Sequence, residues 1–509
     1  MFLSICEAGE QGVSCDGDEG VCGVDKRDVW SVKLKLIEDM EDTIEEKNSE
    51  YQKIIWNYID AVSTQMDIVP VSYNILSAQM LTESRKVEKY RKEHGVPFKD
   101  EDGGGFSMPL EHGIVFNKMM RNLDNSRRAF DMTGENALIG LVCKYDGFLG
   151  DLMKQIFKDK PEILNGSDKE FKASDILTYK DFDELKDVLI EKEIESVLRK
   201  NHVDQLQWLE TKLNVELRKF KLLPEYVEIM ERRNLFVHCN GVVSRQYLSE
   251  CKKFNVKLPE DLKPGDMLDA YIDYVRKAYM VLFQVGVMLG FVLWHKIRPQ
   301  ESSEMIDRLS EVAYTLIKDG EYELGLDIID FALSNKSWAK EINFAQQLIF
   351  RVNKALAFHL RDMQDECIKI ADTMDVTAAD PVYHLAKAIL KLDYDYAYDI
   401  MGKIGKDDEM HANYKTWPLF NKIRQEAAFA DKFKEIYGEE YECCNTRTAA
   451  FEEVIKSAME IVEKAKEMNE KRKNAEVHDA NVEEVEAEIV DAEEVVEEKV
   501  MADTSSSEK

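Results

Sequence analysis

The chain has 509 residues, of which 33% are charged and 44% hydrophobic, and its formal net charge is −31 at pH 7. This length predicts two to four domains with hydrophobic cores, and the composition is typical of a soluble globular protein. Because phosphates attract basic surfaces, the acidic balance argues against unspecific coating of nucleic acid or of an anionic membrane. A local phosphate site is compatible with it.

Nine cysteines are spread along the chain without a CxxC pair. An odd number without paired spacing argues against a disulfide framework or a zinc knuckle, and predicts reduced thiols in a cytoplasmic protein. The opening residues MFLSICEAGEQG lack the basic start and the apolar core of a signal peptide. Residues 1–25 are rich in Gly, Cys and acids, so we expect a loose N-terminal segment.

Residues 26–130 are expected to form an N-terminal helical region. Apolar residues recur at three- and four-residue steps from Trp30 to Val62, which predicts a long amphipathic helix. The Gly, Pro and Asp content of 92–109 predicts a loop. Its Gly103-Gly104-Gly105 run lacks the Gly-Lys-Ser/Thr of a phosphate-binding loop, so we interpret it as a flexible tip.

Helical patterns then resume at Glu135 and recur over 182–198, from Pro224 to a stop at Asn240-Gly241, and over 267–296. Strand-like alternation is nearly absent, so the predicted fold class is all-α. The stretch 278–294 is about 17 residues long, at the short limit for a membrane span. It contains Gln284 and has charged residues on both flanks, which favours a buried core helix over a transmembrane helix.

From about residue 303 the pattern changes to paired helices with short turns, at Asp319-Gly320 and near Arg361-Asp362. The spacing of roughly 34–40 residues is in the range of helical solenoid repeats. These units resemble tetratricopeptide-type repeats in period and pattern, without the full repeat signature. Residues 301–440 are therefore expected to form an α-solenoid that binds a protein or nucleic-acid trigger.

Residues 441–509 divide into two parts. Apolar residues at helical spacing over 449–470 predict an amphipathic helix, with Phe451, Val454, Ile455, Ala458, Val462, Ala465 and Met468 on one face. Residues 474–509 contain 13 acidic residues and two lysines, and we expect a disordered, solubilising tail. The alternative is an acidic arm that competes with nucleic acid for a basic site.

The stretch RRNLFVHCNGVVSRQYL, residues 232–248, places polar residues on the apolar side of a helix. On a helix over 224–240 the spacing of a buried stripe is met by Tyr226, Ile229, Met230, Arg233 and Val237. Glu231, Asn234 and His238 follow one another beside that stripe. Burying such groups requires partners. One interpretation is structural: Glu231 pairs with Arg233 or Arg232, and His238 caps the helix end, where the helix dipole favours a cation.

The longer string ERRNLFVHCNGVVSRQYL resembles the signature of the HEPN superfamily, an all-α domain with Arg, a polar residue and then His near a helix C-terminus. Arg233-Asn234 and His238 match that motif directly. Asn240-Gly241, Val243 and Tyr247 look like its continuation in HEPN proteins of prokaryotic defence and toxin systems. The similarity covers about 135–298, within an expected HEPN-type helical bundle at 131–300. Helical repeats are a familiar companion of such domains.

The resemblance implies a metal-independent endoribonuclease, in antiviral defence or toxin–antitoxin biology, that uses no cofactor. HEPN nucleases are typically homodimers in which two motifs meet to form one RNA-cleaving site. In this interpretation Arg233, Asn234 and His238 are catalytic, and the supporting residues are Glu231, Arg232, Asn240 and Tyr247. Histidine, with a reference pKa near 6.5, transfers protons at neutral pH, and an arginine fork holds two phosphate oxygens.

Two alternatives accompany this interpretation. The first, a metal-dependent nuclease, is disfavoured, because the nine histidines include no HExxH and no close pair. The sequence therefore predicts no metal site. The strongly acidic charge favours a second function, a non-catalytic HEPN and helical-repeat scaffold that acts through protein–protein contacts.

Overall fold

The computed structural model describes residues 49–100, 103–166 and 179–442. The predicted segments at 1–25, 30–48, 449–470 and 474–509 lie outside the described residues. The described chain forms two compact units that interleave along the sequence. Unit 1 contains 49–61, 143–166, 179–227 and 280–442, and unit 2 contains 62–100, 103–142 and 228–279.

The all-α class is confirmed, since the described elements are helices apart from one two-stranded hairpin. The chain passes between the units within α2, α3, α7 and α9. The elements are α2 Glu50–His94, β1 Val96–Asp100, β2 Gly103–Ser107, α3 Leu110–Asp159, η1 Pro161–Gly166, α5 Phe182–Leu198, α6 His202–Leu213, α7 Leu223–Cys239, α8 Arg245–Lys253, α9 Ile272–Ile297, η2 Pro299–Glu301, α10 Ser302–Lys318, α11 Tyr322–Ser334, α12 Phe344–Leu360, α13 Gln364–Asp372, α14 Pro381–Leu390, α15 Tyr394–Ile404, α16 Asp408–Thr416, η3 Pro418–Phe420, η4 Ile423–Gln425 and α17 Ala427–Tyr437.

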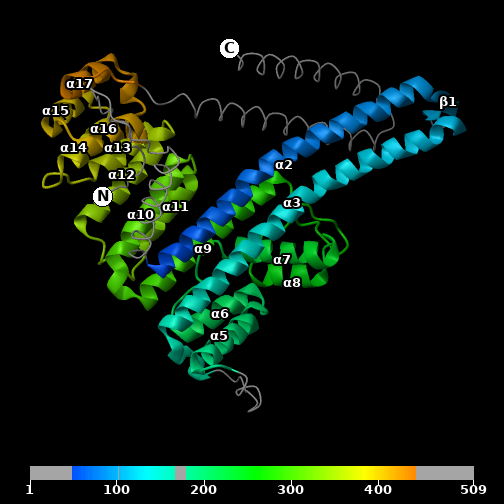
Figure 1. Cartoon of the computed structure of the whole chain (residues 1–509), viewed down its shortest axis with the longest axis horizontal. Helices are drawn as coiled ribbons and strands as arrows, with labels where there is room; N and C mark the ends of the chain where they lie inside the picture. Colours follow the sequence, from blue (N-terminus) through cyan, green and yellow to red (C-terminus); the bar gives the residue numbers. More distant parts are fainter. Residues whose placement is uncertain (1–48, 101–102, 167–178, 443–509) are drawn as a thin grey trace, which may run out of the picture. The chain divides into compact units, whose positions relative to one another are not determined.

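In unit 2, α2 and α3 run side by side and are joined by the β1–β2 hairpin (Figure 1). We call residues 62–94, the hairpin and residues 110–142 the arm. Near its middle the rings of Tyr73 and Phe130 meet edge to face at 5.0 Å. Near the hairpin the Tyr90 hydroxyl lies 3.0 Å from Nδ1 of His112. Aromatic contacts therefore join the two helices of the arm along their length.

The prediction of a loop over 92–109 is wrong in its central part, which forms the β1–β2 hairpin. Helix α3 begins at Leu110, well before Glu135, where the sequence predicts that a helix resumes. The two strands pair antiparallel, with Val96 opposite Ser107 and Phe98 opposite Gly105. The Phe98 ring lies so close to Gly105 that a Cβ there would come within 2.9 Å of it. The glycines of 103–105 suggest a flexible tip from the sequence. In the structure, Gly105 instead leaves room for the Phe98 ring on the opposite strand.

The core of unit 1 forms where α9 meets the first turns of α2 and the end of α3. The Tyr58 hydroxyl donates to the Leu282 carbonyl oxygen at 2.7 Å, and the Tyr58 ring stacks on Phe148 with centroids 4.3 Å apart. Gly286 is required there, because a Cβ would lie 2.2 Å from the Tyr58 ring. The close approach of α9 to α2 therefore depends on a residue without a side chain.

Among the described residues, α9 is the one helix long and apolar enough to cross a membrane, with a mean hydropathy of 1.7 over its most apolar window. Of that window, 72% is buried inside the structure, which is how a core helix behaves.

An ion cluster joins the ends of α3 and α9 in unit 1. Arg298 donates two hydrogen bonds to the Asp159 carboxylate, at 2.8 and 2.9 Å, and one to Glu301 at 2.9 Å. Glu301 also accepts from Trp294 Nε1 at 2.7 Å and from Ser49 Oγ at 2.8 Å. Burial alone would raise the pKa of both carboxyls, but the Arg298 hydrogen bonds outweigh it and hold each pKa below its usual range.

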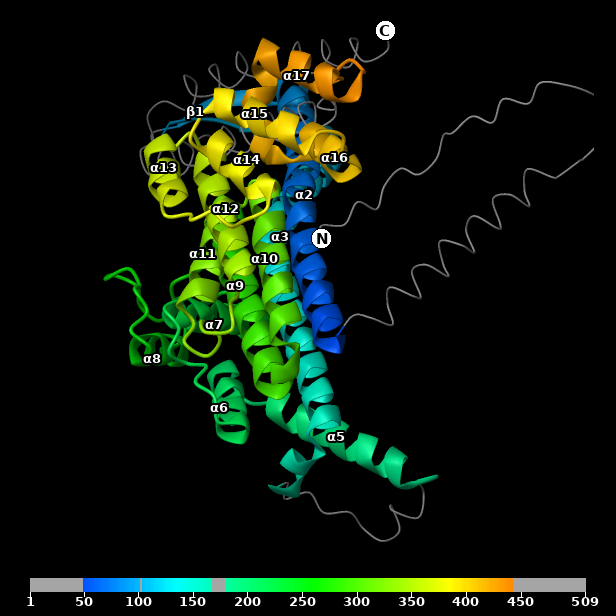
Figure 2. The same cartoon turned by 90° about the vertical axis from the view of Figure 1, so that its left-hand side faces the viewer.

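Residues 302–437 of unit 1 form successive helix pairs in which α10 packs on α11, α12 on α13 and α14 on α15 (Figure 2). The predicted turns at Asp319-Gly320 and Arg361-Asp362 are confirmed. A left-handed residue sits in the turn of each pair, Gly320, Asp362 and Leu392 respectively. Such residues let the chain reverse within the three positions that separate the two helices of each pair.

The His359 ring in α12 is fully buried. Burial, and then the positive charge of Lys422, lowers its pKa to about 4. The unfolded chain binds a proton near pH 6.5. Unfolding therefore takes up a proton between about pH 6.5 and 4, and the free energy of unfolding falls as the pH falls through that window.

We predict that His359→Leu abolishes this contribution, which is on the order of 3 kcal/mol between the two ends of the window. Thermal melting of wild type and variant at pH 7, 6, 5 and 4 measures it. His384→Leu, which removes a partly exposed histidine in α14, is the control and should keep the wild-type pH dependence. Equal loss of the pH dependence in both variants would contradict the assignment.

Candidate functional site

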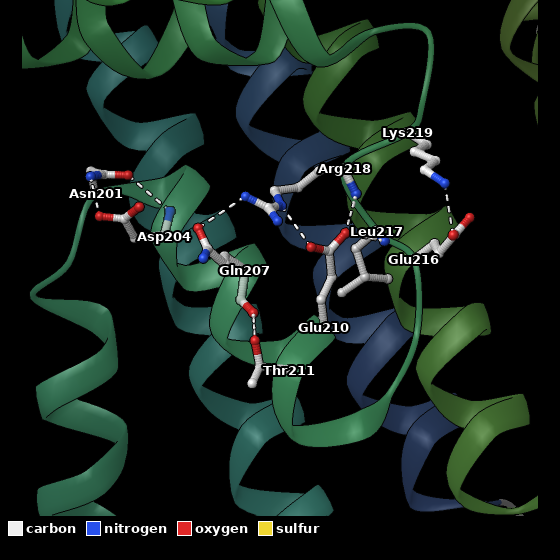
Figure 3. Close-up of polar contacts among 9 residues, drawn as sticks. All are labelled: Asn201, Asp204, Gln207, Glu210, Thr211, Glu216, Leu217, Arg218 and Lys219. Carbon is white, nitrogen blue, oxygen red and sulfur yellow. Dashed lines mark hydrogen bonds and ion pairs between the residues drawn. The ribbon is translucent and has the colours of Figure 1, made fainter.

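A polar cluster orders the loop 214–222 that leads into the motif helix (Figure 3). The Glu210 carboxylate in α6 accepts the backbone N–H of Leu217 at 2.7 Å and that of Arg218 at 2.8 Å. It also accepts Arg218 Nε at 2.6 Å, and Arg218 donates to Gln207 at 3.0 Å. Burial opposes ionisation of Glu210, but the two backbone hydrogen bonds and Arg218 lower its pKa. The oxygen atoms of the Glu210 carboxylate therefore hold the loop 214–222 in place.

The motif helix α7 keeps only part of the predicted buried stripe. Tyr226, Ile229 and Met230 are buried, Arg233 is half-buried, and Val237 is 45% exposed. The stripe thus fades toward the C-terminal end, and the prediction that Val237 is buried is wrong. The reason is the arrangement of α8, which packs with Leu235 on another side of the helix.

The centre of the site is the buried carboxylate of Glu228, which is 6% exposed. Its Oε1 accepts Arg232 Nε at 2.7 Å and the Tyr247 hydroxyl at 2.8 Å, and its Oε2 accepts the Tyr274 hydroxyl at 2.6 Å. The Arg232 guanidinium lies 3.9 Å from the centre of the Tyr274 ring and donates to the Asp269 carbonyl oxygen at 3.0 Å. One carboxylate therefore joins α7, α8 and α9.

This network changes the pKa values around it. Burial, and then the Glu228 charge, raises the pKa of the Tyr247 hydroxyl and raises that of the Cys251 thiol to about 12. Burial opposes the Arg232 charge, but Tyr274 and Glu228 outweigh it, so the pKa of Arg232 is raised. The tyrosines and Cys251 thus stay protonated at neutral pH, and the network is fixed as one buried ion pair with two hydroxyl donors.

Arg232 and Tyr247 are predicted from the sequence as supporting residues, whereas Glu228 and Tyr274 are not. Glu228 lies four residues before Arg232, and a Glu to Arg pair at this spacing faces the same side of a helix. That spacing is visible in the sequence. Tyr274, 46 positions away, has no such local signal.

The predicted catalytic residues lie on the other side of α7. Arg233 Nη1 donates to Asn234 Oδ1 at 3.1 Å, so these two side chains are brought together. His238 lies one turn after Asn234, in the last turn of the helix, and is exposed. Glu231 is partly buried.

The end of α7 is fixed by a left-handed turn. Asn240 has φ +48° and Gly241 φ +77°. The Gly241 N–H donates to Leu235 O at 3.1 Å, and its carbonyl accepts Leu268 N–H at 3.0 Å. A Cβ on Gly241 would lie 3.0 Å from the carbonyl oxygen of Leu268. Asn240 therefore acts in the turn that ends the helix just after His238.

A hydrophobic core holds this turn against α8. It consists of Leu235, Val243, Tyr247 and Cys251, all buried, with partly buried residues of the 256–268 loop around it. Cys239 and Cys251 are free thiols, as are Cys143 and Cys367 in unit 1. His238 is thus presented to solvent by a firmly packed helix end.

Exposed apolar side chains surround the presented end of α7. Val237 is 45% exposed, Val242 36% and Met267 66%. Val242 and Met267 are opposite each other in an antiparallel bridge. Among the described residues, no group of three or more His, Cys, Asp or Glu is placed to hold a metal ion. The motif residues Arg233, Asn234 and His238 therefore lie toward this end of α7, which also carries exposed apolar side chains.

We predict that Arg232→Ala lowers the free energy of unfolding by about 3–5 kcal/mol, because it leaves the Glu228 carboxylate buried without its cation. Arg245→Ala, at an exposed position in α8, is the matched control and should change stability by less than about 0.5 kcal/mol. Urea denaturation of both variants measures the difference. Near-native stability of Arg232→Ala would show that the network is not needed for the fold.

Comparison of the chain with protein-family models, with curated proteins and with solved structures found no match.

Proposed function

We propose that this protein is a metal-independent endoribonuclease of HEPN type. The observation that carries the proposal is the placement of the motif residues. Arg233 and Asn234 are hydrogen-bonded to each other, and the exposed His238 follows one turn later on a helix end that is packed and capped. Under this proposal Arg233, Asn234 and His238 act on RNA, while Arg232, Tyr247 and Asn240 support them.

The charges around the motif support an RNA substrate. The buried ion pair of α7 is made by Glu228 and Arg232, so the helix has a structural arginine apart from Arg233. Helix α8 follows the motif and carries Arg245, Lys252 and Lys253 against one acid, Glu250. This locally basic segment gives RNA phosphates a favourable field within a chain of net charge −31.

The chemistry uses the substrate's own nucleophile. The 2′-oxygen of RNA bonds to the adjacent phosphorus, the bond from phosphorus to the 5′-oxygen breaks, and the products are a 2′,3′-cyclic phosphate and a 5′-hydroxyl. A proton leaves the 2′-hydroxyl and another joins the departing 5′-oxygen, which histidine can mediate. Arg233 balances the charge on the phosphate oxygens in the transition state, and Asn234 orients Arg233 through their hydrogen bond.

A single His238 can serve one of these two proton transfers at a time, so we propose that two protomers form one site. The exposed apolar rim of Val237, Val242 and Met267 beside His238 supports such an interface, because soluble proteins seldom leave apolar side chains grouped in this way. In a two-fold dimer the same rim on each protomer meets its copy.

The finer fold assignment belongs to the same proposal. Residues 131–300 would be the HEPN-type bundle, and the helix pairs of 301–440 a tetratricopeptide-like solenoid that binds a protein or nucleic-acid trigger. A cytoplasmic location, without membrane attachment, fits an enzyme that acts on cellular RNA in antiviral defence or toxin–antitoxin biology. The alternative, a scaffold acting through protein contacts, would use the same helix pairs without RNA cleavage.

We predict that the purified protein cleaves total RNA or a tRNA pool in the presence of EDTA. Arg233→Ala and His238→Ala should each reduce cleavage by about 10²-fold or more, because each removes a group used in the transition state. Arg199→Ala, at an exposed position just after α5, is the matched arginine control and should retain most activity. Polynucleotide kinase should label the fragments directly, because they carry 5′-hydroxyl ends.

Intact RNA in every lane, at any protein concentration, would contradict the proposed nuclease activity and favour the alternative function as a scaffold. Cleavage that disappears in EDTA would contradict the metal-independent mechanism. An oligonucleotide whose 2′-hydroxyls are replaced by hydrogen should resist the wild-type enzyme, and its cleavage would exclude the 2′-oxygen as nucleophile.

We predict that the wild-type protein is a homodimer and that Met267→Glu converts it to a monomer, because a carboxylate would be buried at the interface. Sedimentation velocity at tens of micromolar protein measures this. Leu110→Glu, at a 96% exposed apolar position on the arm, is the control and should remain dimeric. A monomeric wild type under these conditions would count against the composite site.

A further inference from the structure

One exposed face of α2 in the arm has an unusual composition. The segment 62–82 contains a single charged residue, Asp67, in 21 positions, although 33% of the chain is charged and about seven charges (0.33 × 21) would match the average. Its exposed residues include Ile68, Val71 and Ile75, which are 53%, 56% and 62% exposed. Solvent-facing helix positions usually carry charged residues, so this face differs from an ordinary surface.

The exposed residues form a continuous stripe. At helical periodicity Thr64, Ile68, Val71, Ile75, Ala78 and Thr82 fall on one side of α2, with Asp67 at the edge. The opposite side is occupied, since Tyr73 packs against Phe130 of α3. From Thr64 to Thr82 the stripe is about 27 Å long at 1.5 Å per residue. An uncharged stripe of this length with large apolar side chains is suited to a second helix.

The chain itself contains a segment with the matching feature. Residues 449–470 place Phe451, Val454, Ile455, Ala458, Val462, Ala465 and Met468 at helical spacing. Between the first and last of these a helix would be about 26 Å long, nearly the length of the α2 stripe. The charged residues of the segment fall between these positions, so a helix would present an uncharged face.

We propose that residues 449–470 form a helix that docks along the Thr64 to Thr82 stripe of α2 and makes the arm a three-helix structure. The two apolar faces agree in length and in the absence of charge. Both belong to one chain, so the docking would be intramolecular. This inference does not rest on ribonuclease activity.

Hydrogen–deuterium exchange of the full-length chain, read by mass spectrometry, tests the docking. In wild type the backbone amides of 449–470 should exchange slowly. Val71→Glu and Ile75→Glu should each accelerate their exchange about ten-fold or more, because a carboxylate would enter the apolar contact. Ile114→Glu, at an 83% exposed apolar position of α3 outside the stripe, is the matched control and should leave it unchanged.

The amides of α9 report on folding in the same experiment and should keep wild-type protection in every variant. If Val71→Glu disturbs them, Ile75→Glu decides the question. Exchange of 449–470 at the rate of an unstructured peptide in wild type would overturn the proposal, as would slow exchange that persists in both stripe variants. Dissociation of a dimer by Val71→Glu with unchanged exchange at 449–470 would also overturn it and assign the stripe to a second copy.

Discussion

The carboxylate of Glu228 is the contact on which the candidate site depends. It is nearly excluded from solvent and is held by an arginine of its own helix, a tyrosine of α8 and a tyrosine of α9. A buried charge is costly unless its partners satisfy it, so removing any one of them penalises the whole arrangement. These contacts hold α7 against the residues of α8 and α9 that belong to unit 2.

Two adjacent arginines in α7 therefore have different physical situations. Arg232 stacks on Tyr274 and pairs with Glu228, so its charge is used in holding unit 2 together. Arg233 is half-buried and donates to the neighbouring Asn234, on a helix end that presents His238 to solvent. The two arginines therefore differ in their contacts, although they are adjacent in the sequence.

Close packing in both units depends on positions where a side chain is absent. Gly286 lets α9 approach the Tyr58 ring in unit 1, and Gly105 makes room for Phe98 in the arm hairpin.

The ion cluster of Asp159, Arg298 and Glu301 fixes the ends of α3 and α9 in unit 1, as the Glu228 network fixes α7 in unit 2. In both cases an arginine donates hydrogen bonds to a carboxylate of another turn or helix.

The sequence by itself determined the all-α class, the helix at 182–198, the stop at Asn240-Gly241 and the turns of the helix pairs, because periodicity and turn residues are local properties of the chain. It also gave the motif residues as a hypothesis. Only the tertiary structure decided that Val237 is exposed, that 92–109 contains a hairpin, and that Glu228 joins Arg232, Tyr247 and Tyr274. Those outcomes depend on which distant segments meet, and a partner 46 residues away leaves no mark in helical spacing.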